Sequence, residues 1–263
     1  MKEYIASEFL KEKRQRNKHL AVVCWMILMF FLIKNVYHLT SKAGILDLYC
    51  DNVQIYIFIT LMFSILYTMV LFGDEYRNGT IYQLQMIPIV PLKFILAKIL
   101  MVICFNSLIM MTTTIGCIFI IGIKGLNLTS SSIAILLFIN LADSLLLSMV
   151  MFPIALFAIL YKENYIVSLL LNISYIMLGL MMPSLPLKQE IAQKLTAYLH
   201  PLGSYALIHN WFIYKFVPYE TSMLSKPKES AVVAFLGMLI WSVICCGIME
   251  LLMKKKKKKE KIR

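Results

Sequence analysis

The sequence predicts an all-α integral membrane protein that crosses the bilayer several times, and the composition supports this before any motif is considered. The chain has 263 residues, of which 60% are hydrophobic and only 15% are charged. Ordinary soluble domains are about 45–50% apolar and about 25% charged. Because so few charges could not cover so much apolar surface, the composition excludes a cytosolic enzyme, a disulfide-rich secreted protein and a disordered chain.

Six apolar stretches are long enough to cross a bilayer. A spanning helix needs about 20 mostly apolar residues to cover about 30 Å of hydrocarbon. The first stretch is longer than the apolar core of a signal peptide and has no small-x-small cleavage site after it, so we expect it to be retained. We therefore expect a single transmembrane domain over residues 1–263. Its six spans are residues 20–39, 52–72, 95–123, 132–160, 165–186 and 231–253.

Two other segments are expected to lie at the membrane interface. Residues 2–16 carry apolar side chains at helical spacing between charged ones, which predicts an interfacial amphipathic helix, with a frayed polar tail as the alternative. Residues 187–230 combine prolines with many aromatic side chains, which favour a membrane interface. We therefore expect short, partly re-entrant helices in a structured outer segment before the last span. The apolar residues of the first segment are Ile5, Ala6, Phe9 and Leu10, and the aromatic residues of the second include Trp211, Phe212, Tyr214 and Phe216.

Lysine and arginine are distributed unevenly between the expected loops. If both termini are cytoplasmic, the inner segments hold 18 basic residues and the outer segments hold 8. Basic residues accumulate on the cytoplasmic side of membrane proteins, so we expect this orientation. The two basic clusters, residues 11–18 and 254–259, flank apolar segments. We interpret them as topology signals and contacts with anionic membrane lipid, and not as a nucleic-acid site.

The loop after the second predicted span carries the most informative motif. The Asn-Gly pair that ends at Gly79 is a strong turn signal. Thr80 then stands at an N-cap position, Gln83 completes a capping box, and Pro88 ends the helix that follows. Such a short helix is not stable alone, so it needs the membrane interface or a partner protein to pack on. Its apolar residues are Ile81, Leu84, Met86 and Ile87.

The order of Glu75, Gly79, Thr80, Pro88 and Lys98 resembles the ABC-2 type permease family. In that family a Glu precedes a Gly-Thr pair, a short coupling helix follows, and a Pro and a Lys lead into the third span. The predicted six-span layout is similar as well. The resemblance implies a transmembrane subunit of an ATP-driven exporter that docks on a separate ATPase. It implies a motor-docking loop formed by Glu75, Gly79, Thr80, Ile81, Leu84 and Pro88.

The resemblance also implies partners and a setting. The family works as a pair of permeases with two ATPases, so we expect an ABC ATPase and a second, identical or similar permease. The chain has no G-x-x-x-x-G-K-S/T phosphate loop, so ATP and Mg are expected in the partner and no cofactor in this chain. Chains of this layout resemble bacterial plasma-membrane permeases for self-protection against lantibiotics and other antimicrobial peptides. Related exporters move drugs, sodium or lipid-linked substrates, and these alternatives stay open.

Asp143 is the only carboxylate deep in a predicted span, which makes it a functional candidate. Asn140 and Ser144 lie on its face of the helix. This group is interpreted either as a polar patch on the translocation path or as hydrogen bonding between helices or subunits. Because no basic residue is expected beside Asp143, we expect it to be protonated or hydrogen-bonded to Asn140, Asn172 or residues 112–114.

A membrane-embedded enzyme is the first rival class of function, and a secondary transporter, which would need paired intramembrane charges or an internal repeat, is the second. The chain has neither an H-E-x-x-H motif nor a G-x-S-x-G elbow. Two of its histidines, His200 and His209, are expected in the outer segment with an interfacial role and not as metal ligands. We therefore expect no catalytic residue and no metal site in this chain.

Overall fold

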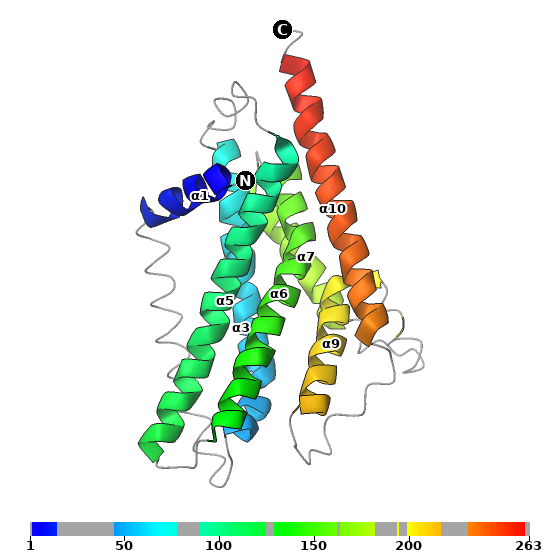
Figure 1. The fold of residues 1–263 in the computed structure, drawn as a ribbon. Coiled ribbons are helices and arrows are strands. Elements are labelled where there is room, and N and C mark those ends of the chain that lie inside the picture. Colours follow the sequence, from blue (N-terminus) through cyan, green and yellow to red (C-terminus); the bar gives the residue numbers. More distant parts are fainter. Residues whose placement is uncertain are drawn as a thin grey trace.

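The structure is a computed structural model in which the described residues are helical almost throughout. It describes residues 2–14, 45–77, 90–124, 129–161, 164–181, 194, 199–216 and 231–260, and no strand occurs among them. The all-α prediction is therefore confirmed for this part of the chain. The helices are α1 (Lys2–Arg14), α3 (Ile45–Arg77), α5 (Pro91–Lys124), α6 (Ser130–Leu160), α7 (Tyr165–Met181), α9 (Pro201–Phe216) and α10 (Ala231–Glu260) (Figure 1).

Four of the described helices are long and apolar enough to cross a membrane. The segments are Ile55–Asp74 in α3, Pro91–Ile123 in α5, Ser130–Leu160 in α6 and Ala231–Lys254 in α10. They correspond to the second, third, fourth and sixth predicted spans. Helix α7, in the fifth, has 17 residues, which cover about 25 Å of the roughly 30 Å needed. The predicted first span, residues 20–39, lies outside the described residues. The structure thus supports a multi-pass membrane protein with four of the six predicted spans.

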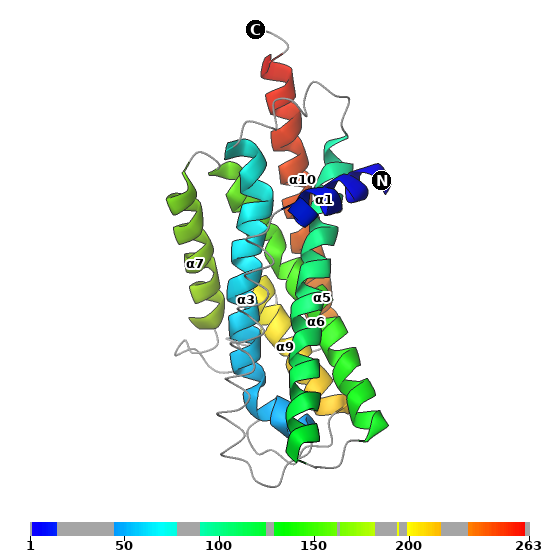
Figure 2. The same ribbon diagram turned by 90° about the vertical axis from the view of Figure 1, so that its left-hand side faces the viewer.

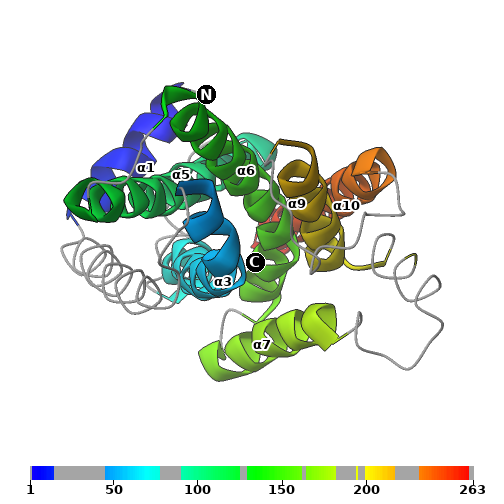
Figure 3. The ribbon, with the colours of Figure 1, turned by 90° about the horizontal axis from the view of Figure 1, so that it is seen from below.

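Helix α6 occupies the centre of the bundle. It packs on α3, α5, α7, α9 and α10. Viewed along the bundle, it lies between α3 and α5 on one side and α9 and α10 on the other (Figure 3). Apolar side chains fill the middle of α6, among them Leu147, Val150 and Ile154, which are fully buried. A polar side chain on the buried face of this helix must therefore find its partner inside the protein, since water cannot reach it.

One end of the bundle gathers several helix ends that are far apart in the sequence. The last residues of α3, the first residues of α5 and the last residues of α10 all lie at the upper end in Figure 1. Helix α1 lies across the bundle at this end, packed on α5 (Figure 2). It occupies Lys2–Arg14 of the predicted interfacial helix over residues 2–16. The end of α3 and the start of α5, which flank residues 78–89 in the sequence, therefore lie at the same end of the bundle as α1.

The predicted outer segment contains a helix that packs into the bundle. Helix α9 lies in the lower half of the bundle, whereas α7 lies in the upper half (Figure 2). The two helices meet at His200, whose Nε2–H donates to the carbonyl of Tyr175 at 2.9 Å. The Nδ1 atom of the same ring accepts the backbone N–H of Leu202 at 3.2 Å and so caps α9. Pro201 begins α9 at the position where a missing N–H costs nothing.

This junction requires a glycine on α7. A Cβ atom at Gly179 would lie 2.5 Å from Cε1 of His200 and 3.0 Å from Cβ of Leu202. The imidazole could not move aside freely, because both of its nitrogen atoms are hydrogen-bonded to the backbone.

We predict that Gly179→Ala lowers the melting temperature of the purified protein in detergent. Forcing a methyl group into a packed site costs about 1–3 kcal/mol. The matched control is Gly122→Ala in α5, where nothing lies within 4 Å of the added Cβ. The control should leave the melting temperature unchanged or raise it slightly, because alanine has a higher helix propensity than glycine. Equal melting temperatures for the two variants would contradict the close packing of α7 on His200.

Candidate functional site

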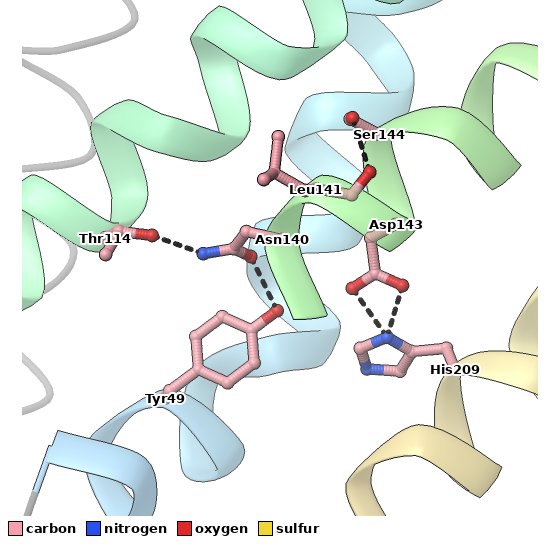
Figure 4. A network of polar contacts seen from close by, with 7 residues as sticks. All are labelled: Tyr49, Thr114, Asn140, Leu141, Asp143, Ser144 and His209. Carbon is pink, nitrogen blue, oxygen red and sulfur yellow. Dashed lines mark hydrogen bonds and ion pairs between the residues drawn. The ribbon is translucent and has the colours of Figure 1, made fainter. Parts of the chain in front are cut away.

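The central polar feature of the bundle is an ion pair between α6 and α9. The Nδ1 atom of His209 lies 2.9 Å from Oδ1 and 2.8 Å from Oδ2 of Asp143 (Figure 4). Asp143 is 0% exposed and His209 is 2% exposed. In this contact the Nδ1–H of His209 donates and the carboxylate of Asp143 accepts. The pair joins two residues that are 66 positions apart in the sequence.

Burial makes this pair decisive for how α9 packs. A carboxylate removed from water without a partner is very costly, and removing one member of a buried ion pair costs about 3–5 kcal/mol. The other ring nitrogen of His209, Nε2, is buried without a hydrogen-bond partner among the described residues, and so is the hydroxyl of Tyr205. The Tyr205 ring stacks on His209 with 6.0 Å between ring centroids. Although Tyr205 lies beside the pair, the hydrogen-bond donor to Asp143 is His209 of α9.

The prediction that Asp143 has no basic partner is wrong. It failed because His209 was assigned to an outer segment with an interfacial role, whereas α9 brings it into the bundle. The sequence did carry a signal for this helix, since the segment after Pro201 places buried side chains three or four residues apart. These are Leu202, Tyr205, His209 and Ile213, and Ile208 lies three residues after Tyr205. At 16 residues α9 is too short for a search based on span length to find.

Asn140 and Ser144 do not join the ion pair. They are four residues apart and share one face of α6, whereas Asp143 is turned about 100° from Ser144. Asn140 accepts the hydroxyl of Tyr49 at 3.0 Å and donates to Thr114 (Figure 4). Ser144 lies 3.0 Å from the hydroxyl of Ser107 on α5. The predicted patch is therefore divided, with Asn140 and Ser144 facing α3 and α5 and Asp143 facing α9.

A second set of polar contacts links the same three helices further along α6. Asn106 on α5 donates to the hydroxyl of Ser148 at 3.0 Å and accepts the hydroxyl of Ser64 on α3. All three side chains are buried. Side-chain hydrogen bonds between membrane helices contribute about 0.6 kcal/mol each on average. These contacts favour the interhelical interpretation of Asn140 and Ser144 over a polar path, and individually they are weaker than the ion pair.

The predicted motor-docking loop falls mostly outside the described residues. Gly79, Thr80, Ile81, Leu84 and Pro88 all lie there, and only Glu75, in the last turn of α3, belongs to a described helix. The helices that carry the loop are described, and α3 packs on α5. Lys98, the last residue of the motif, is fully buried in α5. The structure therefore places the two ends of the loop, and the role of the loop stays a prediction.

Among the described residues, no group of three His, Cys, Asp or Glu side chains could hold a metal ion. Asp143 and His209 make a pair and nothing larger. The arrangement is suited to holding helices together and to changing their packing when the pair is broken.

We predict that His209→Ala destabilises the protein strongly, because it leaves the Asp143 carboxylate buried without its donor. The expected loss is about 3–5 kcal/mol in the free energy of unfolding, seen as a large fall in melting temperature. Tyr214→Ala, on the same helix but at a side chain that is 52% exposed, is the matched control and should have a small effect. Similar losses in the two variants would show that the pair does not hold α9 to α6.

Comparison with known proteins agrees with this architecture. A family model described as "ABC-2 family transporter protein" matches residues 4–179, roughly two thirds of the chain. The matched region runs from α1 into α7, and it includes Asp143, the loop over residues 78–89 and Lys98. None of the curated proteins searched matches the chain. On the family match and the apolar helices that it covers, the chain belongs to the ABC-2 family of membrane transport proteins.

Proposed function

We propose that this chain is the permease subunit of an ATP-driven exporter in a bacterial plasma membrane, docked on a separate ABC ATPase. Family membership supports a transport role, since ABC-2 permeases work with an ABC ATPase and are not themselves enzymes. The observation that carries the docking proposal is the gathering of α1, the end of α3 and the start of α5 at one end of the bundle. The helix ends that flank residues 78–89 lie at this end, and a motor docked there would be beside both of them.

We propose that ATP is bound and hydrolysed by the partner ATPase and not by this chain. The chain has no phosphate loop, so ATP and Mg would be bound by the partner. A second permease, identical or similar, would complete the pathway with this one. ATP binding would bring the two motors together, the short helix at residues 81–87 would pass the movement to α3 and α5, and the permease pair would switch access across the membrane.

We predict that Gly79→Val weakens binding of the ATPase while the helices still insert. The turn at Gly79 is expected to need a positive φ, which costs a β-branched residue about 1–3 kcal/mol. Thr80→Ala should act in the same direction, because it removes the expected N-cap of the docking helix. The measurement is co-purification of the ATPase and its stimulated ATP hydrolysis. Gly122→Val, in open space on α5, is the control and should keep both. Full complex formation by the Gly79 and Thr80 variants would disprove the docking assignment.

Both termini are proposed to face the cytoplasm, from the excess of basic residues in the segments on that side. A cysteine placed near Lys258, in a chain whose native cysteines have been replaced, should react with a membrane-impermeant thiol reagent only after the cells are permeabilised. Labelling in intact cells would reverse the orientation. It would also put residues 78–89 out of reach of a cytoplasmic ATPase, because the helix ends that flank them, in α3 and α5, lie at the same end of the bundle as the C-terminal part of α10.

The proposed cargo is an amphipathic peptide antibiotic, such as a lantibiotic, removed from the membrane. Support comes from an aromatic cluster where α6 and α9 meet, opposite the end that carries α1. The Phe138 ring contacts those of Phe212 and Phe216 edge-on, with centroids 5.9 and 5.5 Å apart. Lys215 lies over the ring of Trp211 at 5.0 Å. Phe138 is half exposed, so the cluster offers an apolar surface beside a cation, which suits a molecule with both apolar and polar groups.

We predict that deleting the gene raises sensitivity to membrane-active peptides and leaves sensitivity to sodium and hydrophobic drugs unchanged. Growth inhibition by a panel of all three classes measures this. Restoring the gene should restore resistance, and restoring it without the ATPase should not. Unchanged peptide sensitivity together with a sodium or drug phenotype would reject the peptide cargo and favour one of the other substrate classes of this family.

A further inference from the structure

Lys98 is a fully buried cation where three helices meet. It lies in the second turn of α5 and is 1% exposed. Lysine is almost never buried to this extent unless it is paired, because its ammonium group is strongly hydrated. Its surroundings therefore have to replace water.

The partners of Lys98 come from three helices. The Nζ atom donates to the carbonyl of Leu71 on α3. It lies 3.7 Å from Oε2 of Glu8 on α1, which makes an ion pair. It also lies over the rings of Phe72 on α3 and Phe94 on α5, at 5.6 and 5.1 Å from their centroids. Lys98 thus links α1, α3 and α5 through one charged group.

The packing of α1 turns a charged side chain toward the bundle. Glu8 is 5% exposed, whereas the neighbouring apolar residues Phe9 and Leu10 are 49% and 60% exposed. The helix therefore directs a charge at the bundle and leaves these apolar side chains outside, where a lipid surface can cover them. Oε2 of Glu8 makes no hydrogen bond among the described residues, so Lys98 is the group that compensates its charge. This ion pair therefore joins α1 to α5 through two buried side chains.

Lys98 also lies close to the two helix ends that flank residues 78–89. Leu71 is six residues before Arg77, the last residue of α3, or about 9 Å along the helix. Lys98 is seven residues after Pro91, the first residue of α5. Because helices are stiff over such distances, a displacement of the loop would shift Leu71 and Lys98, and through them Glu8.

We propose that the Lys98–Glu8 pair is the joint through which movement of loop 78–89 reaches α1 in the membrane interface. This inference rests on the proposed docking of the ATPase at that loop, and it makes Lys98 a positioning residue. A buried ion pair suits this role because it has a defined geometry and is costly to break. An apolar contact would let α1 slide instead.

The test uses the complete complex of permease and ATPase in lipid vesicles. A spin label on a cysteine at Ala6, an exposed position of α1, reports the movement of that helix when ATP is added. The six native cysteines are replaced beforehand. Co-purification of the ATPase and its stimulated ATP hydrolysis are measured in the same preparations.

In the parent complex we expect ATP to change the label's spectrum. Lys98→Met should keep the ATPase bound, abolish the spectral change and lower stimulated hydrolysis by about fivefold or more. Glu8→Leu should also abolish the spectral change and lower stimulated hydrolysis, although Lys98 keeps its hydrogen bond to Leu71. This variant replaces Lys98→Met in the test if Lys98→Met does not fold. The exchange Glu8→Lys with Lys98→Glu should recover part of the response. Lys93→Met, at an exposed lysine on the same helix, is the matched control and should behave as the parent.

The outcomes separate this inference from the proposed function. If the complex forms and Lys98→Met and Glu8→Leu both keep the ATP-dependent change at α1, the joint is disproved and the docking proposal stands. If Lys93→Met impairs the response as much as Lys98→Met does, the effect reflects loss of any positive charge and the joint is again disproved. If no ATPase binds the parent permease, the docking proposal and this inference fail together.

Discussion

The fold depends on one constraint: charged groups that water cannot reach must be paired across helices. Asp143 on α6 is held by His209 on α9 at 2.8 Å, and Lys98 on α5 is held by Glu8 on α1 and by a carbonyl of α3. Apolar packing alone leaves membrane helices free to rotate and slide, since lipid tails are as apolar as leucine. The ion pairs remove this freedom, because each is costly to leave unmade and is satisfied in one arrangement only.

The position of α6 follows from the same constraint. It is the helix that contacts α3, α5, α7, α9 and α10, and it carries polar side chains on two of its faces. Asn140 accepts a hydrogen bond from Tyr49 of α3, and Ser148 accepts one from Asn106 of α5. Asp143 instead binds His209 of α9. Hydrogen bonds on one face and an ion pair on the other give α6 a defined rotation. The apolar residues between them then fill the core.

The sequence predicted the long helices and missed the contacts that orient them. Spans such as residues 132–160 can be predicted from the sequence, because a run of about 20 mostly apolar residues indicates a membrane-spanning helix. Helix α9 was not predicted as part of the bundle, because its 16 residues are fewer than a span needs and lie in a stretch rich in proline and aromatic residues. His209 lies in this helix and was therefore predicted at the membrane interface. The predicted face of Asn140, Asp143 and Ser144 was too wide, since Asp143 is turned toward another helix. For α1, the periodicity located an interfacial helix, but it gave no sign that Glu8 is buried against the bundle.

The most direct test of this account is exchange of the charges at the α6–α9 contact. Asp143→His alone places two imidazoles together, and His209→Asp alone places two carboxylates together, so each should lower the melting temperature markedly. The double exchange rebuilds the pair with its members on opposite helices. The account predicts that the double variant melts at a higher temperature than either single variant. A double variant no more stable than the less stable single one would contradict it, because the packing of α9 would then not depend on the pair.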